Sequence, residues 1–176
     1  MRTLAVVVAI AALSTPALAG PPTAARCDQP PAPAGRGVRA IDWCRAEVGV
    51  WGGPLVAGRA EVHLDEPDGQ GHDTTITTLR SIDFADVDGD RRPEAMLVLE
   101  RAHWSAAGVE ASRSSDLVIF TVRGGRPHRL TALPIGTPVD DLVVRRGVVT
   151  LVSGPDRATT RWRWDRRRQA LVERVR

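Results

Sequence analysis

Short apolar runs alternate with polar breaks along the chain from Val38 onward. The runs are rich in Val, Leu, Ile, Thr and Trp, and Gly, Pro and Asp separate them at intervals of about ten residues, as expected for antiparallel strands. No window has the period of an amphipathic helix. The pattern therefore predicts an all-β fold, with antiparallel strands in a sandwich or an open, propeller-blade-like sheet and no substantial helix. Strands are expected at residues 41–44, 48–51, 58–64, 74–84, 95–104, 116–122, 128–133, 142–145, 148–153, 160–164 and 170–174.

The runs at 95–99 and 117–122 are apolar at successive positions. Because neighbouring side chains of a strand point to opposite faces, both faces of these strands should be covered, and we expect them to be central in the sheet. The segment 161–164, Arg-Trp-Arg-Trp, alternates instead. Its tryptophans should face the core and its arginines should face away from it, within a final hairpin that turns at 165–168.

Residues 1–19 have the organisation of a secretory signal peptide. A charged start precedes an apolar run at 4–13, and Ala-Leu-Ala at 17–19 is typical of a cleavage site. The apolar run is shorter than the roughly 20 residues that a membrane-spanning helix needs. We therefore expect export to the periplasm or the extracellular space, with no transmembrane segment.

The next stretch, 20–37, is rich in proline and predicts an extended arm, followed by a single all-β domain at 38–176. Cys27 lies in this arm and Cys44 lies in the domain, and the chain has no other cysteine. An even number of cysteines in an exported protein favours a disulfide, which would attach the arm to the domain.

All lysine-or-arginine positions of the chain are arginine. The chain has 24 basic and 21 acidic residues, a formal charge of +3, and it lacks Lys, Asn and Tyr. With abundant Ala, Gly, Pro, Val and Asp, this composition is typical of a GC-rich bacterial genome, so the high isoelectric point says little about partners. No nucleic-acid partner is expected for an exported protein.

An acidic loop separates two of the predicted strands. Carboxylates at positions 1, 3 and 5, a backbone carbonyl at 7 and a further carboxylate can surround calcium, which prefers several hard oxygen ligands. In this chain the positions are occupied by Asp86, Asp88, Asp90, Arg92 (through its carbonyl) and Glu94 at position 9. A full EF-hand is excluded, because that loop needs glycine at position 6 and glutamate at position 12.

The segment 86–94, Asp-Val-Asp-Gly-Asp-Arg-Arg-Pro-Glu, resembles the calcium loop of FG-GAP and VCBS repeats, the strand–loop–strand units of integrin-type β-propellers. It is also similar to the single-copy loop of secreted bacterial proteins of unassigned function. The resemblance covers residues 82–98 and implies that the five positions named above are the calcium ligands. It does not extend to a whole propeller, because the mature chain is too short for the usual number of blades.

Arg91 departs from the family pattern, which has a second glycine at this place. A positive φ there costs a non-glycine residue roughly 1 to 2 kcal/mol. The guanidinium could also neutralise the carboxylates with no ion bound. Two interpretations stay open: a calcium site, or a solvated acidic hairpin turn that descends from one.

The leading expectation is therefore a non-enzymatic exported module with calcium as its cofactor, in a structural or binding role. The alternative is an anion-binding protein, because arginines crowd the C-terminal quarter beside Trp162 and Trp164 and could contact a polyanion or the cell envelope. Catalysis is not expected, because the sequence shows no nucleophile paired with a base. Four histidines are scattered without metal-ligand spacing, and each is expected to be an ordinary strand or surface residue: His63, His72, His103 and His128.

Overall fold

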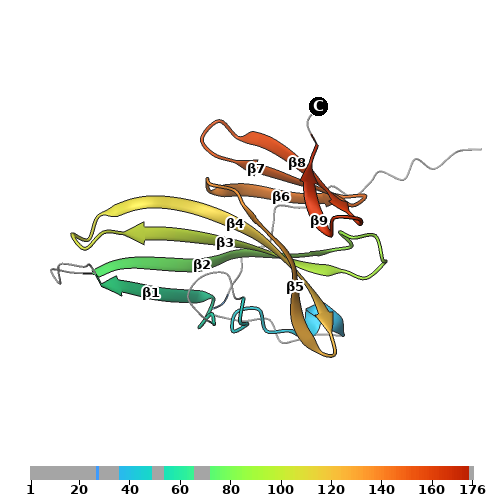
Figure 1. Ribbon diagram of the computed structural model, residues 1–176, viewed down its shortest axis with the longest axis horizontal. Helices are drawn as coiled ribbons and strands as arrows, with labels where there is room; N and C mark the ends of the chain where they lie inside the picture. Colours follow the sequence, from blue (N-terminus) through green and yellow to red (C-terminus); the bar gives the residue numbers. More distant parts are fainter. Residues whose placement is uncertain (1–26, 28–35, 49–53, 66–71, 175–176) are drawn as a thin grey trace, which may run out of the picture.

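The computed structural model describes residues 27, 36–48, 54–65 and 72–174. The predicted signal peptide and almost all of the proline-rich arm lie outside these ranges, as do residues 49–51 of one predicted strand. The described residues form two antiparallel sheets, and their one helical element is a short 3-10 helix, η1 (Gly37–Ala40) (Figure 1). The predicted all-β fold is confirmed. No helix in this part of the chain is both long and apolar enough to cross a membrane.

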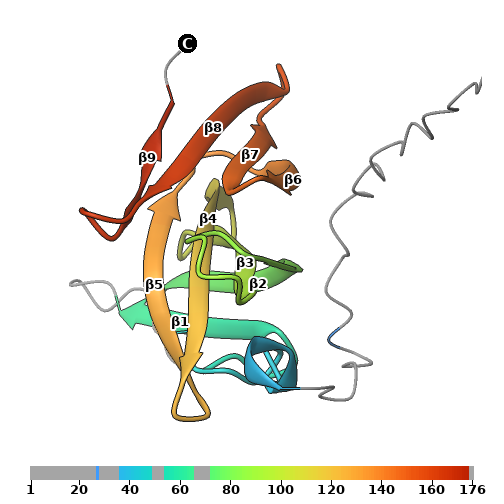
Figure 2. The same cartoon turned by 90° about the vertical axis from the view of Figure 1, so that its right-hand side faces the viewer.

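The first sheet is a five-stranded meander in which each strand pairs with the next one along the chain. It curves strongly, so that β5 wraps around the side of the molecule (Figures 1 and 2). Neighbouring strands pair antiparallel throughout, as the spacing of polar breaks predicts. The strands are β1 (Arg59–Asp65), β2 (His72–Ala85), β3 (Glu94–Trp104), β4 (Glu110–Arg123) and β5 (Arg126–Pro134).

The second sheet has four strands, also in chain order, and packs over one end of the first (Figure 1). The connection between the sheets is fixed at Ser115 of β4, which is 1% exposed. Its carbonyl accepts a hydrogen bond from the Ile135 N–H at 2.8 Å, and its hydroxyl accepts one from the Val139 N–H at 3.3 Å. The strands are β6 (Val139–Arg145), β7 (Val148–Ser153), β8 (Ala158–Asp165) and β9 (Ala170–Glu173).

Strands β3 and β4 are buried on both faces, as their continuous apolar runs predict. On one face Leu97 and Val118 pack under the N-terminal segment, and on the other Met96 and Ile119 pack against the second sheet. Trp162 and Trp164 enter this second cluster and are each 8% exposed. The predicted inward orientation of both tryptophans is confirmed.

The predicted strand at 41–44 is wrong, because this segment forms turns that lie across the first sheet. Its apolar side chains pack onto the first sheet. Trp43 is 3% exposed, and its ring centroid lies 5.2 Å from that of Phe120. Turn bonds replace strand pairing: the Cys44 N–H donates to the Asp42 carboxylate, and the Cys44 carbonyl accepts from the Gly58 N–H. Val48 is also outside any strand.

The predicted disulfide joins Cys27 to Cys44, with 5.5 Å between their Cα atoms. The bond lies against Gly58, where an added Cβ would fall 2.5 Å from the Cys27 sulfur. Gly58 also has a φ of +78°, so its lack of a side chain serves both the turn and the close approach. The disulfide thus attaches residue 27 to the first core cluster.

Removal of this disulfide should lower the free energy of unfolding by about 3 kcal/mol, since it closes a loop with a sequence separation of 17. The Cys27→Ser, Cys44→Ser variant, compared with the oxidised protein by urea denaturation, measures this loss. Reductant should reproduce it in the wild type and leave the variant unchanged. A loss below about 1 kcal/mol in both comparisons would contradict the expectation.

Candidate metal site

The acidic loop connects β2 to β3 on the side of the first sheet that faces the second. Val87, at its centre, is 2% exposed and belongs to the cluster between the sheets, so it anchors the loop in the core. Gly89 and Arg91 have φ values of +78° and +70°. The left-handed conformation expected at Arg91 is therefore present, and the loop keeps its tight course despite the missing glycine.

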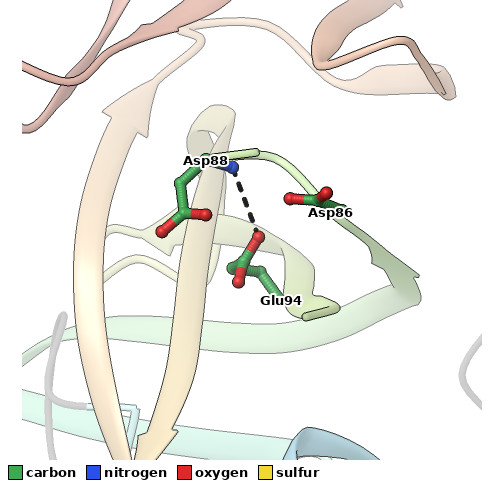
Figure 3. Close-up of side chains that lie close together, drawn as sticks. All are labelled: Asp86, Asp88 and Glu94. Atoms are coloured by element: carbon green, nitrogen blue, oxygen red, sulfur yellow. Dashed lines mark hydrogen bonds between the residues drawn. The ribbon is translucent and has the colours of Figure 1, made fainter. Parts of the chain in front are cut away.

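Three of the predicted ligands come together in this loop. Carboxylate oxygens of Asp86, Asp88 and Glu94 all lie within 4.8 Å of one another. Figure 3 shows the three side chains around a common space, with Glu94 rising from the start of β3. Glu94 is 1% exposed, whereas the two aspartates are half-buried. A group of this kind can hold a metal ion through oxygen ligands.

Backbone N–H groups of the loop fix the orientation of these carboxylates. Glu94 Oε2 accepts hydrogen bonds from Val87 at 2.7 Å and Asp88 at 3.4 Å. Asp86 accepts from the N–H groups of Gly89 and Arg91, at 2.7 and 3.1 Å. The loop therefore places its acidic groups through its own backbone, which is the preorganisation that an oxygen-ligated ion needs.

The electrostatics of the group centre on Glu94. The pKa of this carboxyl is raised to about 7, chiefly by burial and also by the charges of Asp88 and Asp90, although the hydrogen bonds from the Val87 and Asp88 N–H groups act in the opposite direction. Burying an ionised carboxylate beside others of the same charge is costly without a counter-charge. Either a proton or a cation can supply that counter-charge.

The Asp90 carboxylate, which the family resemblance also implies as a ligand, is not one of the three grouped carboxylates. The carbonyl of Arg92 stays a prediction. The Asp90 carboxylate accepts a hydrogen bond from the Arg92 N–H at 2.7 Å, and the Asp90 N–H donates to Asp88 at 2.9 Å. These bonds form successive Asx turns that stabilise the bend. These hydrogen bonds help to shape the loop around the group of Asp86, Asp88 and Glu94.

A second feature of the sequence meets this loop in space. Arg166, in the β8–β9 turn, donates hydrogen bonds to the carbonyls of Asp88 at 3.0 Å and Gly89 at 2.6 Å. The acidic loop and the arginine-rich hairpin, which the sequence presents as separate candidates, are therefore neighbours. With Trp162 and Trp164 buried, stacking on exposed tryptophan is not how this hairpin would hold a polyanion.

The histidines are less scattered than the sequence suggests. The rings of His63 and His72 lie 4.9 Å apart in an edge-on contact, and His63 also contacts Thr74 at 3.1 Å and Glu61 at 3.3 Å. The pairing of β1 with β2 could have predicted this contact. Its register places Asp65 opposite His72, so the two histidines are diagonal neighbours on one face of the sheet. They lie on an exposed hairpin of the first sheet.

Comparisons of the chain with protein-family models, with curated proteins and with solved structures found no match.

Proposed function

We propose that the protein is an exported, non-enzymatic binding module whose acidic loop holds calcium. The observation that carries the proposal is the convergence of three carboxylates, from Asp86, Asp88 and Glu94, within 4.8 Å of one another, with Glu94 almost fully buried. Like charges at this separation repel strongly in a partly desolvated site, and a divalent cation among them reverses the sign of the interaction.

The chemistry of the donor set favours calcium over other metals. All three side chains offer hard oxygen atoms, and a loop of this length leaves room for carbonyls and water to complete the six to eight ligands that calcium takes. Zinc, copper and nickel prefer sites with nitrogen or sulfur. Export agrees with the Cys27–Cys44 disulfide, because such bonds persist in oxidising compartments.

Calcium should raise the melting temperature of the mature protein by roughly 5 to 10 °C when its concentration is far above the dissociation constant, because it binds only the folded loop. Asp88→Ala should abolish this rise and the heat of binding measured by titration calorimetry. Chelation should reverse the rise in the wild type.

Asp156→Ala is the matched control, because Asp156 is exposed in the β7–β8 turn, away from the loop. This variant should keep the full calcium response. An identical melting curve with calcium and with chelator would reject the site, and the solvated acidic turn would then be the better description of the loop.

A further inference from the structure

A cleft of about 860 Å³ lies where the acidic loop meets the second sheet. Its walls come from three parts of the chain: the loop at 85–89, the β6–β7 turn, and the β8–β9 hairpin. Figures 1 and 2 show these segments gathered at one end of the molecule. Arginine is its most frequent lining residue, and the arginines concerned are Arg146, Arg163, Arg166, Arg167 and Arg174.

Most of these arginines have unused hydrogen-bonding capacity. Arg166 is committed to the loop carbonyls. Within the described part of the chain, the guanidinium groups of the other four make no ion pair or hydrogen bond, and all four side chains are exposed. Uncompensated arginines of the β6–β7 turn and the β8–β9 hairpin therefore line one cleft, and they suit an anionic ligand.

The acidic groups of the cleft are largely occupied. Asp165 accepts hydrogen bonds from the N–H groups of Arg167 and Arg168 and is near the Arg168 guanidinium at 3.8 Å. Asp86 and Asp88 accept N–H groups of their own loop. Glu173 is the remaining lining carboxylate. The unpaired charge that faces the cleft is therefore mainly positive.

We propose that this cleft binds an acidic oligosaccharide, whose sulfate or carboxylate groups the guanidinium forks of Arg146, Arg163, Arg167 and Arg174 hold. The planar fork matches the geometry of an oxyanion and can contact it through two parallel hydrogen bonds. Because the arginines are spread over the β6–β7 turn and the β8–β9 hairpin along an open cleft, a chain that carries several anionic groups can contact more of them than a single small anion can.

The surroundings of the cleft favour a sugar over other polyanions. Single-stranded nucleic acid is usually held by exposed aromatic rings on which bases stack, whereas Trp164, the aromatic residue in this lining, is 8% exposed. Insertion into a lipid surface uses exposed apolar side chains beside the cations. The large exposed apolar residues of the described chain are Val56, Leu64 and Val109, and none of them lines the cleft.

Calcium in the loop should strengthen this binding, an effect that rests on the proposed function. Asp86 and Asp88 line the cleft as well as the metal group. A divalent cation that neutralises them removes repulsion from an incoming oxyanion, so binding of the two ligands is linked and reciprocal. The arginine contacts do not depend on the ion.

The test is fluorescence polarisation at low ionic strength with two labelled probes, a sulfated heparin oligosaccharide and an oligogalacturonate of equal length. Arg163→Gln, Arg167→Gln, Arg174→Gln in one chain should weaken binding of the better probe about tenfold or more. The matched control replaces Arg36, Arg123 and Arg126, which are exposed and carry the same total charge. The turn that separates Arg123 from Arg126 lies at the bottom of Figure 2, on the opposite side from the second sheet. This control should bind within a factor of about two of the wild type.

Equal losses of probe affinity in both triple variants would reject the cleft as the binding site, because net charge alone would then explain the binding. Tighter binding of oligothymidylate, or of vesicles rich in phosphatidylglycerol, would overturn the choice of ligand class. Calcium binding is measured in parallel by calorimetry. If calcium binds but does not raise the affinity for the probe, only the linkage between the two ligands is rejected. If the protein binds the probe through these arginines but does not bind calcium, the proposed function is rejected and the oligosaccharide site is supported.

Discussion

In the presence of a chelator, the protein should lose stability as the pH rises from about 4.5 to about 7, by an amount on the order of 3 kcal/mol in the free energy of unfolding. Glu94 is the cause. Burial raises its pKa to about 7 from an ordinary value of 4.5, so the folded state holds this proton more tightly than the unfolded state does. The stabilisation is complete below the unfolded-state pKa of 4.5 and is lost as the pH rises through the folded-state pKa of about 7.

Glu94→Gln tests this directly, because the amide is neutral at every pH and its oxygen can still accept the hydrogen bond from the Val87 N–H. The variant in chelator should lose most of the pH dependence and should be more stable than the wild type above pH of about 7. Urea denaturation across this range measures both effects. The pKa of Asp83 is also raised, by burial and by the charge of Asp141. This effect is the same in both proteins, so it cancels in the comparison.

Calcium should reverse the trend in the wild type, because the ion binds ionised carboxylates and displaces the proton. Its affinity should therefore rise with pH up to about 7, and Glu94→Gln should weaken binding at every pH. Glu110→Gln is the control, since Glu110 is paired with Arg113 on the exposed part of β4. A pH dependence in Glu94→Gln equal to that of the wild type would contradict the assignment.

Trp43→Ala should destabilise the protein by about 3 to 5 kcal/mol, the usual cost of removing a buried indole. The side chain is 3% exposed, packs on Phe120 and donates a hydrogen bond from Nε1 to the Val38 carbonyl at 2.8 Å. Its loss would leave a cavity under the N-terminal segment and a carbonyl without its partner.

Trp43→Phe separates the two contributions, because it keeps most of the ring and removes the donor. It should cost less than half as much as the alanine variant. Unfolding followed by far-ultraviolet circular dichroism measures both. Val56→Ala, at a residue that is 73% exposed, should change stability by less than about 0.5 kcal/mol. A similarly small effect of Trp43→Ala would show that the segment does not contribute to the core.

The sequence was sufficient to predict the strands that follow residue 58, because their apolar spacing and turn residues agree with local preference. Each of those nine predicted ranges contains a strand of the structure. The alternation at 161–164 also predicts correctly that both tryptophans face the core. The error at 41–44 has a physical origin. Apolar residues of a loop that covers a sheet have the same composition as a short strand, and only tertiary packing distinguishes them.

The candidate site was predictable only as far as its local part. Asp86, Asp88 and Glu94 belong to one loop, so their spacing determines their proximity. The contact of Arg166 with the carbonyls of Asp88 and Gly89 joins positions more than 70 residues apart, and it depends on how the second sheet packs on the first. No local pattern carries that information, and the cleft was therefore not predictable.

The most direct test of the calcium site is a crystal structure of the mature protein grown with calcium. We predict a density peak among Asp86, Asp88 and Glu94, with carboxylate oxygens at about 2.3 to 2.6 Å from it. A map in which these oxygens keep only their N–H partners, with no ion between them at saturating calcium, would contradict the proposal.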